Sequence, residues 1–548
     1  RKFFFNKMNY LIRQRIQNRL RGEQGAYHRA GAGLRVGIAY PNKYFFGMSN
    51  LGFQTLYAVL NRLPDTSCER FFLPEEDLLA QHAPGGLQGY ELGSSARELA
   101  MVAFSVSYQN DYLNLIPMLH LMGLKSRSQD RDEGDPLILV GGPAATINPE
   151  PIADFCDALV IGEGEEVIER IADILRGGGS KASRLEQLDK LDGVYVPALF
   201  NPATDRGAGG KATAGFGLVS GKANGRPQEG RFIRYPSYDA LEPLKRRIDH
   251  GLQYRKKIGL IAGDLLGHDA IHEILEYIDA QGGGFSPSSV RLNAFTPEII
   301  HYLRKSGNKT IAIAPEAGSE RLRRSLNKTF SDDEVVESAV KLAEGGILNI
   351  KLYIMIGLPT ETEVDVDELC RLTLRTREAL TRFAKRSAKM PSLTLSVSPF
   401  TPKPSTPLQY SPFVGVPALK EKLQNIRKQV LQVGHIRMSG ESGLDAYIET
   451  LLSRGDRRVG EFLHKALVPA GKALVVGSAA HLRKSMLNLS FDPETFVSRT
   501  YRTDEPLPWD FIDHGMKDTF LIRELGKFES GKITHYCMPE VCRSCGVC

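Results

Sequence analysis

The sequence contains no run of apolar residues long enough to span a membrane, although 42% of its 548 residues are hydrophobic. It also lacks a strong excess of either charge, because 70 basic and 64 acidic side chains leave a net charge of +6. We therefore expect no membrane span, and the overall charge gives no reason to expect a nucleic-acid partner. A chain of this length is too long for one hydrophobic core and predicts roughly two to four domains.

Cysteine is scarce over most of the chain. Cys68, Cys156 and Cys370 are isolated from one another along the chain. We expect these three residues to be buried as small hydrophobic side chains, in a protein of the reducing cytoplasm.

The first 33 residues form a basic segment. Arg1–Arg29 carries eight basic side chains and one acid, Glu23. Such a segment is typical of a transit-like presequence, of a surface for an acidic partner, or of a solvated helix packed on the body of the protein. We favour the packed helix.

Residues 34–200 alternate strands with helices. This alternation predicts an α/β domain with a doubly wound, flavodoxin-like parallel sheet. No GxGxxG follows the first strand, so the fingerprint of a dinucleotide site is absent. Gly141, Gly142 and the segment 162–164 follow two strands at the end where such sheets bind ligands, although glycines there could equally make tight turns. The predicted strands are Leu34–Ala39, Glu98–Ser105, Leu137–Val140 and Ala158–Ile161.

Residues 201–236 are rich in glycine, alanine and lysine, which is typical of a linker. A second βα series follows over 237–410 and predicts a partial barrel. The segment Ile350–Ile356 is an apolar run of the kind found in strands buried on both faces. The strands of this series are predicted at Ile258–Ala262, Ser289–Leu292, Thr310–Ala314, Ile350–Ile356 and Ser392–Ser398.

The polar loops after the strands Thr310–Ala314 and Ile350–Ile356 are predicted to converge. A strand–helix–strand unit is normally right-handed and parallel, so both loops lie at the same end of the sheet, where α/β proteins bind ligands. The converging side chains would be Glu316, Ser319 and Glu320 from the first loop and Thr360 and Glu361 from the second.

Residues 411–548 form a mixed C-terminal extension that ends in a cluster of cysteines. Cys537, Cys542, Cys545 and Cys548 lie within twelve residues. Four thiolates this close repel one another and oxidise unless a metal holds them. The consecutive x2 spacings favour an iron–sulfur cluster, with zinc as the alternative. Four protein ligands leave no open iron, so the site would relay electrons or stabilise structure.

Four motifs occur in a recognisable order: APEAGSERLRR, KLYIMIGLPTET, SPFTPKPSTPLQ and the terminal CRSCGVC. Together with the doubly wound domain, the chain resembles the radical S-adenosylmethionine (SAM) proteins that carry an N-terminal cobalamin-binding-like domain, roughly from Arg35 to its end. The resemblance implies a partial (βα)6 barrel with a 4Fe-4S cluster on three cysteines spaced CxxxCxxC. It also implies cleavage of SAM to a 5′-deoxyadenosyl radical, with an electron donor such as a flavodoxin or a ferredoxin.

The resemblance assigns SAM contacts to particular residues. Glu316, Gly318 and Ser319 would contact the methionine or ribose part of SAM. The segment Met355–Leu358, which includes Gly357, would lie against the adenine. Gly263 and Asp264 stand where the family presents a backbone–acid pair to the methionine amine, although the sequence here is AGD and not GGE.

Cobalamin is a further candidate cofactor by the same resemblance. Ser105, Gly141 and Gly142 are where its nucleotide tail would lie. However, the DxHxxG motif that supplies a histidine to cobalt is missing, since the sequence after the first strand is YPNKYFFGMSNLG. Either cobalamin binds without a protein ligand or the domain keeps only the fold, and we favour the second interpretation.

The CxxxCxxC motif itself is absent, because no cysteine lies between Cys156 and Cys370. Its expected position is Phe232–Leu244, where no strand precedes the predicted helix. Removing a central parallel strand would expose buried surface at a high cost, so we favour a segment missing near Pro236 over an evolved deletion.

Three functions follow from these patterns. The leading hypothesis is a radical SAM enzyme that generates a 5′-deoxyadenosyl radical or methylates an unidentified substrate. The alternative is a non-catalytic protein that binds an iron–sulfur cluster or a corrinoid. The third is an RNA-modifying, methylthiotransferase-like enzyme, for which the basic segments Arg1–Arg29 and Arg454–Arg458 are the only local support. Nucleic acid is not the expected partner.

Overall fold

The computed structural model describes residues 2–27, 29–79, 82–202, 241–262, 265–287, 290–535 and 542–546. The chain divides into two compact units. The first unit comprises Arg1–Ile233, Pro402–Tyr410 and Ile448–Met516, and the second comprises Arg234–Thr401, Ser411–Tyr447 and Lys517–Cys548. The predicted C-terminal extension 411–548 therefore contributes to both units. Residues 203–236 of the predicted linker 201–236 lie outside the described residues.

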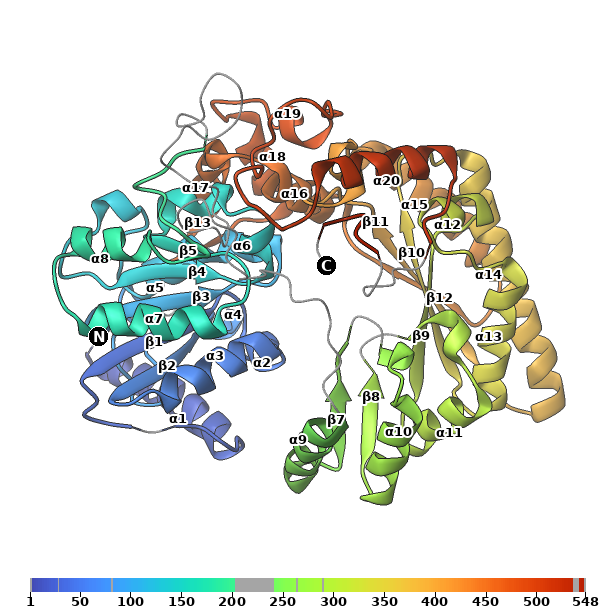
Figure 1. The fold of residues 1–548 in the computed structure, drawn as a ribbon, viewed down its shortest axis with the longest axis horizontal. Coiled ribbons are helices and arrows are strands. Elements are labelled where there is room, and N and C mark those ends of the chain that lie inside the picture. Colours follow the sequence, from blue (N-terminus) through green and yellow to red (C-terminus); the bar gives the residue numbers. More distant parts are fainter. Residues whose placement is uncertain are drawn as a thin grey trace. The chain divides into compact units, whose positions relative to one another are not determined.

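The first unit contains a six-stranded sheet in the order β2-β1-β3-β4-β5-β6 (Figure 1). Strands β1 to β5 pair in parallel, and β6 runs antiparallel to β5. The predicted α/β fold with a parallel sheet is confirmed, whereas β2 and β6 were not predicted. The strands are β1 (Leu34–Tyr40), β2 (Thr66–Phe72), β3 (Met101–Ser105), β4 (Leu137–Gly141), β5 (Ala158–Val160) and β6 (Val194–Tyr195).

Strand β2 escaped prediction because its sequence, TSCERFF, places two charged residues in a strand that is buried throughout. The Arg70 guanidinium donates to Glu91 at 2.6 Å and to Glu23 at 2.7 Å, so the buried charge is paired. The Glu69 carboxylate accepts from the backbone N–H groups of Leu92 and Ser94. Specific partners far along the chain thus replace the apolar pattern expected of a buried strand.

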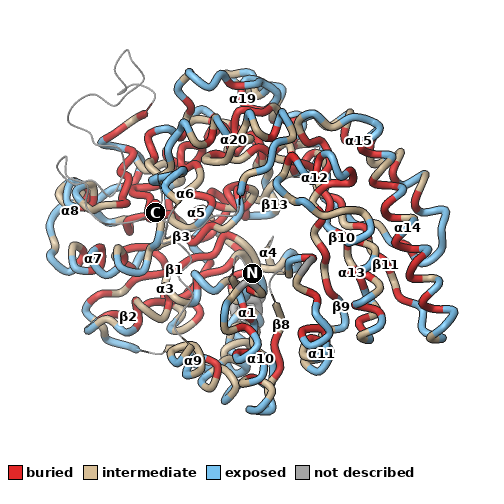
Figure 2. The backbone as a smooth tube through the Cα atoms, turned by 45° about the vertical axis from the view of Figure 1, so that its right-hand side comes forward, coloured by how far each residue is buried: buried red, intermediate tan, exposed pale blue. Residues whose placement is uncertain are grey.

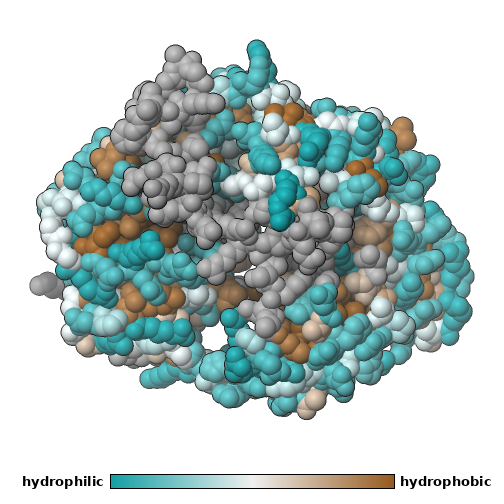
Figure 3. Space-filling view, viewed as in Figure 1, coloured by the Kyte–Doolittle hydropathy of each residue, from teal (hydrophilic) through white to brown (hydrophobic). Residues whose placement is uncertain are grey.

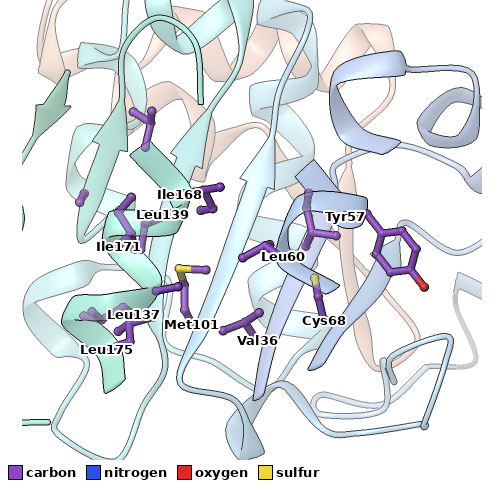
Figure 4. Packing of buried hydrophobic residues seen from close by; sticks show 14 of the residues in the cluster. Val36, Tyr57, Leu60, Cys68, Met101, Leu137, Leu139, Ile168, Ile171 and Leu175 are labelled. Carbon is purple, nitrogen blue, oxygen red and sulfur yellow. The ribbon is translucent and has the colours of Figure 1, made fainter. Parts of the chain in front are cut away.

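A hydrophobic core lies between one face of this sheet and the helices α3, α7 and α8 (Figure 4). Helix α3 begins where Asn50 Oδ1 accepts from the backbone N–H of Phe53. Helix α7 buries Ile168, Ile171 and Leu175, which recur at helical spacing. The helices of this part of the unit are α2 (Tyr44–Met48), α3 (Leu51–Arg62), α4 (Glu76–Leu79), α5 (Leu115–Leu121), α6 (Pro143–Ile147), α7 (Glu165–Arg176) and α8 (Lys181–Leu188).

The basic N-terminal segment forms helix α1 (Lys2–Arg21), which is held to the first unit by ion pairs. Arg15 pairs with Asp77 at 2.9 Å, and Arg19 pairs with Glu75 at 2.7 Å. The prediction of a helix packed on the body is confirmed for this part of the segment.

Residues 448–516 complete the first unit. The Asn148 amide donates to the carbonyls of Ser453 and Gly455, and Arg457 donates to the Tyr195 hydroxyl at 2.6 Å. The elements here are α16 (Gly443–Arg454), which begins in the second unit, α17 (Gly460–Lys465), β13 (Leu467–Ala470), β14 (Ala473–Val476), α18 (Ala479–Leu487) and α19 (Glu494–Val497).

The second unit holds a four-stranded sheet in the order β12-β11-β10-β9 and a separate pair, β7-β8. All neighbouring strands are parallel. The strands are β7 (Lys257–Leu260), β8 (Gly284–Pro287), β9 (Thr310–Glu316), β10 (Asn349–Ile356), β11 (Ser392–Pro399) and β12 (Ile436–Gly440). The helices are α9 (Leu241–Tyr254), α10 (Ile271–Ala280), α11 (Pro297–Lys305), α12 (Glu320–Ser325), α13 (Asp332–Glu344), α14 (Glu363–Ser387), α15 (Val416–Val430) and α20 (Asp518–Ser530).

Two strand predictions in this unit are wrong. The strand predicted at Ser289–Leu292 lies earlier, at β8, and Leu292 is instead buried from a short 3-10 helix, Leu292–Ala294. Strand β10 is not buried on both faces. Ile350, Leu352 and Ile354 are buried, whereas Tyr353 is 40% exposed on the opposite face. Among the described residues, the helices cover one face of this sheet only. Buried apolar residues on that face therefore alternate along β10 with more exposed residues on the opposite face.

Buried residues concentrate along the strands of both sheets (Figure 2). The face shown in Figure 3 is largely hydrophilic, with hydrophobic residues in scattered patches. Among the described residues, none of the helices combines the length and the apolar character that a membrane crossing requires.

Candidate functional site

The loops after β9 and β10 are joined by the buried carboxylate of Asp365, near the start of α14. Its Oδ1 accepts from the Ser319 hydroxyl at 2.5 Å, and its Oδ2 accepts from Arg321 at 2.6 Å. The backbone N–H and the hydroxyl of Thr362 also donate to Oδ2. Burial would raise the pKa of Asp365, but these hydrogen bonds outweigh it and lower the pKa to about 2. The predicted convergence is confirmed for Ser319 and Thr360, which Asp365 and Arg321 link, whereas Glu320 accepts from the Asp332 N–H at the start of α13.

Ser319 and Gly318 have structural roles in this arrangement. The Ser319 hydroxyl caps α12 by accepting from the Leu322 N–H, and the residue is buried. A Cβ on Gly318 would lie 2.3 Å from the Leu369 Cβ, so a side chain there would displace α14. Both residues shape the loop, and direct contact of either with SAM remains a prediction.

Glu316 stands at the end of β9, where the sheet register shifts opposite β10. The preceding Pro315 has no N–H to donate, and such positions favour a bulge that redirects the next side chain. Glu316 accordingly has a φ of 70°, which is unusual for a residue with a side chain. Its half-buried carboxylate lies 3.4 Å from the Lys328 ammonium. Of the residues predicted in this loop, Glu316 keeps a partly exposed carboxylate, whereas Ser319 is buried.

Thr360, in the loop after β10, also has a positive φ, of 66°. This conformation is strained for a β-branched residue. The Arg321 guanidinium donates to the Thr360 carbonyl at 2.8 Å while it binds Asp365, and so holds the strained turn in place. Strain of this kind is typical of functional sites.

The turn at Gly357 is fixed by Glu361. The Gly357 N–H donates to Glu361 Oε1 at 3.0 Å, and the Lys422 ammonium lies 3.1 Å from the same oxygen. Burial raises the pKa of the Glu361 carboxyl, which these donors partly offset. Gly357 has a φ of 79°, and a Cβ there would lie 2.7 Å from Val414. Met355, partly buried, precedes this turn on the face opposite the helices.

Sequence reasoning missed Asp365, Arg321 and Lys422 as parts of this site. The signal for Asp365 was present in the capping pattern Thr362–x–x–Asp365. Its bond to Ser319 joins residues 46 positions apart and has no local signature.

The remaining predicted metal and SAM residues are only partly described. Gly263, Asp264, Cys537 and Cys548 lie outside the described residues. Cys542 and Cys545 are partly exposed, and the Cys545 carbonyl accepts from the Lys517 N–H at 2.8 Å. Within the described ranges, no group of histidine, cysteine and acidic side chains is arranged to hold a metal ion. The four-cysteine site therefore stays a prediction.

The cysteines outside the C-terminal cluster do not fit a three-thiolate 4Fe-4S site. Cys68, Cys156 and Cys370 are all buried, as predicted. Burial raises the pKa of the Cys68 thiol well above its ordinary value and that of the Cys370 thiol to about 11, which disfavours the thiolate that binds iron. These three cysteines therefore do not replace the CxxxCxxC motif, which the sequence lacks.

A second candidate site is a cavity of about 290 Å³ in the first unit. It lies at the carboxyl ends of β1, β3, β4 and β5, beside α3 and α7. The predicted residues Ser105, Gly141 and Gly142 all line it. Gly142 has a φ of 104°, and a Cβ there would lie 2.6 Å from the Val106 carbonyl oxygen, so glycine is required. Apolar residues that also line the cavity are Ile38, Leu56, Leu139, Val160 and Ile168.

The same strand ends carry a polar group that was not predicted. The Asn42 amide donates to Asp111 Oδ1 at 2.8 Å, while Asp111 Oδ2 is buried without a hydrogen-bond partner among the described residues. Burial raises the pKa of Asp111 to about 6.

The basic run Arg454–Arg458 makes internal contacts. Arg454 is fully buried and donates to the carbonyls of Val497 and Arg499, with its guanidinium 4.2 Å from the Tyr501 ring. Arg457 binds Tyr195 and Glu150, and Arg458 pairs with Asp456 at 2.7 Å. Arg454 and Arg457 are therefore engaged inside the first unit, whereas the Arg458 side chain is exposed.

Comparison with known proteins adds family information to this geometry. Residues 52–197 match the family described as radical SAM proteins, N-terminal, and residues 223–373 match the radical SAM superfamily. The uncharacterised protein MJ0966 of Methanocaldococcus jannaschii is 28% identical over 449 residues, covering 78% of this chain and 90% of that protein.

Solved structures of radical SAM enzymes give weaker matches. The radical SAM methyltransferase TsrM of Kitasatospora setae aligns at 12% identity and a TM-score of 0.39, covering 66% of this chain and 72% of that one. The coproporphyrinogen III oxidase HemN of Escherichia coli aligns at 13% identity and a TM-score of 0.21, covering 43% of this chain and 54% of that one.

Proposed function

We propose that this chain, which is a member of the radical SAM superfamily, binds SAM at the carboxyl ends of β9 and β10. The superfamily implies SAM and a 4Fe-4S cluster as cofactors, and enzymes that form a 5′-deoxyadenosyl radical or methylate a substrate are the class to which the protein would belong. The observation that carries the proposal is the pair of loops after β9 and β10, tied together by Asp365 and Arg321 inside the matched core region.

Glu316 and the Gly357 turn supply the chemistry that SAM requires. A carboxylate accepts hydrogen bonds from an ammonium group or from ribose hydroxyls. The glycine at 357 permits the positive φ of the turn and leaves room for Val414, so the backbone of this turn is held at the end of β10, where the adenine would lie. Glu316 and Thr360 are both held in strained conformations, which is consistent with a preorganised binding site.

Equilibrium dialysis of the full chain with radiolabelled SAM tests this proposal. Glu316→Gln keeps the shape but removes the charge, and we expect SAM affinity to fall about tenfold, as for a lost charged hydrogen bond. Glu378→Gln, on the exposed face of α14 and paired with Arg382, is the matched control. Equal affinity for SAM in wild type and Glu316→Gln would overturn the assignment of SAM to the carboxyl ends of β9 and β10.

The absent cluster motif supports a second candidate function, a non-catalytic protein that binds an iron–sulfur cluster or a corrinoid. Two measurements separate the candidates. Sequencing the coding DNA across Tyr235–Ser237 shows whether a segment with cysteines is absent here. Incubation with SAM and a reductant, followed by chromatography for 5′-deoxyadenosine, then tests catalysis. An uninterrupted reading frame without extra cysteines, and no product, would support the non-catalytic candidate.

We also propose that the four C-terminal cysteines bind a metal, with iron–sulfur favoured over zinc because of their consecutive x2 spacings. An ultraviolet–visible spectrum of anaerobically purified protein, with iron and zinc analysis, tests this. Loss of the metal in Cys542→Ser but not in Cys370→Ser would support the site.

The glycine-lined cavity in the first unit supports a weaker proposal, that it accepts the nucleotide tail of cobalamin. Asn42, Tyr44 and Ser49, which follow β1, are poor cobalt ligands, so cobalamin would bind there without a protein ligand to the metal. Co-elution of hydroxocobalamin with the protein on a gel-filtration column tests binding, and its failure would leave a domain that keeps only the fold.

A further inference from the structure

One face of the β9–β12 sheet is polar, and the other is apolar. The helices α13 and α14 lie against the apolar face (Figure 1). That face buries Leu352, Ile354, Leu393, Leu395 and Val397. The alternate residues of β10 and β11 form what we call the open face, which is partly or fully exposed: Asn349, Lys351, Tyr353 and Met355 on β10, and Ser392, Thr394, Ser396 and Ser398 on β11. A barrel interior that serves only as a core is filled by branched apolar side chains. The open face carries mostly polar side chains instead.

Two cations and a hydroxyl form one row across the open face. The strand register places Lys351 beside Thr394 and Thr394 beside Arg437. Neighbouring strands lie about 4.8 Å apart, so the backbones at Lys351 and Arg437 are about 10 Å apart, within reach of their long side chains. Ala312 is the β9 neighbour of Lys351, and its small side chain leaves space beside the ammonium.

The next row adds hydroxyl groups. Tyr353 is beside Ser396, and Ser396 is beside Ser439. The Ser439 hydroxyl donates to Ser396 at 3.3 Å, and the Lys351 ammonium lies 5.7 Å from the centre of the Tyr353 ring. The open face thus concentrates hydrogen-bond donors around two positive charges.

Four cations on the helices α13 and α14 of the same unit have acidic partners. Lys341, Arg371, Arg382 and Arg386 on α13 and α14 each lie within 4 Å of an acidic side chain, at distances of 3.9, 3.4, 2.9 and 3.8 Å. In the part of the chain that the structure describes, neither Lys351 nor Arg437 has an acidic partner. Two positive charges in one row, neither with an acidic partner among the described residues, attract an anion.

We propose that Lys351, Thr394 and Arg437 bind the anionic group of a small-molecule substrate, either a carboxylate or a phosphate. Arginine binds both groups through paired N–H donors, and lysine adds a point charge. The inference rests on the proposed function, because such a substrate would lie on the sheet whose strand ends receive SAM. It extends that function by giving the chemical class of the substrate.

The test is calorimetric titration of the full chain, without SAM, with pyrophosphate and separately with citrate at low ionic strength. Lys351→Met and Arg437→Met each remove one charge from an exposed or partly exposed position. We expect each to weaken binding at least fivefold, the double variant to abolish it, and Arg437→Lys to recover part of the loss. Lys341→Met and Arg371→Met, on the helical face, are the matched controls and should leave the affinity unchanged.

Binding of either probe with this pattern supports the proposal, and the preferred probe identifies phosphate or carboxylate. No binding of either, or equal losses in the helical controls, overturns it. Displacement of both probes by a short single-stranded RNA that binds more tightly would replace it with a nucleic-acid site. SAM dialysis with Glu316→Gln is independent of these probes, so failure of the anion site and failure of the proposed function are distinguishable.

Discussion

The two parallel sheets make room for ligands in opposite ways. In the first unit the central strands are buried on both faces, and the cavity at their ends exists because Gly141, Gly142 and Ser105 carry little or no side chain. In the second unit the described helices cover one face of the sheet. The candidate site at its strand ends is built from side chains, among them charged ones, that link two loops.

This difference predicts different sensitivities. A site made by missing side chains tolerates changes of charge nearby but not added volume. A site built around a buried carboxylate and its hydrogen-bond donors tolerates changes of side-chain volume better than it tolerates the loss of that one charge. Variants of each kind in each unit test the comparison.

The largest effect is expected from truncation on the covered face of β10. Leu352→Ala removes a fully buried side chain and should lower the free energy of unfolding of the second unit by about 3–4 kcal/mol. Tyr353→Ala, its neighbour on the open face, should cost no more than about 1 kcal/mol. Chemical denaturation measures both, and similar losses would show that the two faces do not differ as described.

Removing the carboxylate of Asp365 should have the next largest effect. Asp365→Ala leaves Ser319, Thr362 and Arg321 without their shared acceptor, and we expect a loss of about 3 kcal/mol. Asp367→Ala, exposed on the same helix, should change stability by less than about 0.5 kcal/mol. If SAM affinity survived in a folded Asp365→Ala protein, the link between the two loops would not shape the site.

Added volume in the first unit should have a smaller effect. Gly142→Ala places a Cβ at 2.6 Å from the Val106 carbonyl oxygen on a backbone with a φ of 104° and should cost about 2 kcal/mol. Gly52→Ala also borders the cavity, but its nearest contact would be 3.5 Å and it lies in helix α3. That control should be neutral or stabilising by up to about 1 kcal/mol, because alanine favours helices. A thermal melt of the two variants decides this, and equal stability would mean that the cavity wall adapts.

Local patterns made the two sheets and the ends of their central strands predictable. Alternating strands and helices predicted both parallel sheets, and crossover handedness placed the loops of Glu316 and Thr360 at one end. The glycines 141 and 142 predicted the cavity because glycine at a strand end has a steric meaning that survives in any context.

The missed parts depend on contacts between distant residues. Strand β2 is buried because Arg70 meets Glu23 and Glu91, and no local pattern reveals such pairing. Strand β10 was assigned two buried faces because Tyr353 and Met355 are apolar enough to hide the alternation, although the neighbouring sequence SLTLSVS shows it plainly. The Asp365 carboxylate takes part in a local helix cap and in one long-range hydrogen bond, and only the cap can be inferred from the sequence.

The hydrogen bonds of the Asp365 carboxylate also affect how two helix ends open. One carboxylate accepts hydrogen bonds from the capping residue of α14, Thr362, and from that of α12, Ser319. Helix ends ordinarily fray independently, but here neither end can open without releasing the other's acceptor. The backbone amides of α12 and of the first turn of α14 should therefore exchange with deuterium as one cooperative group, although they belong to separate helices.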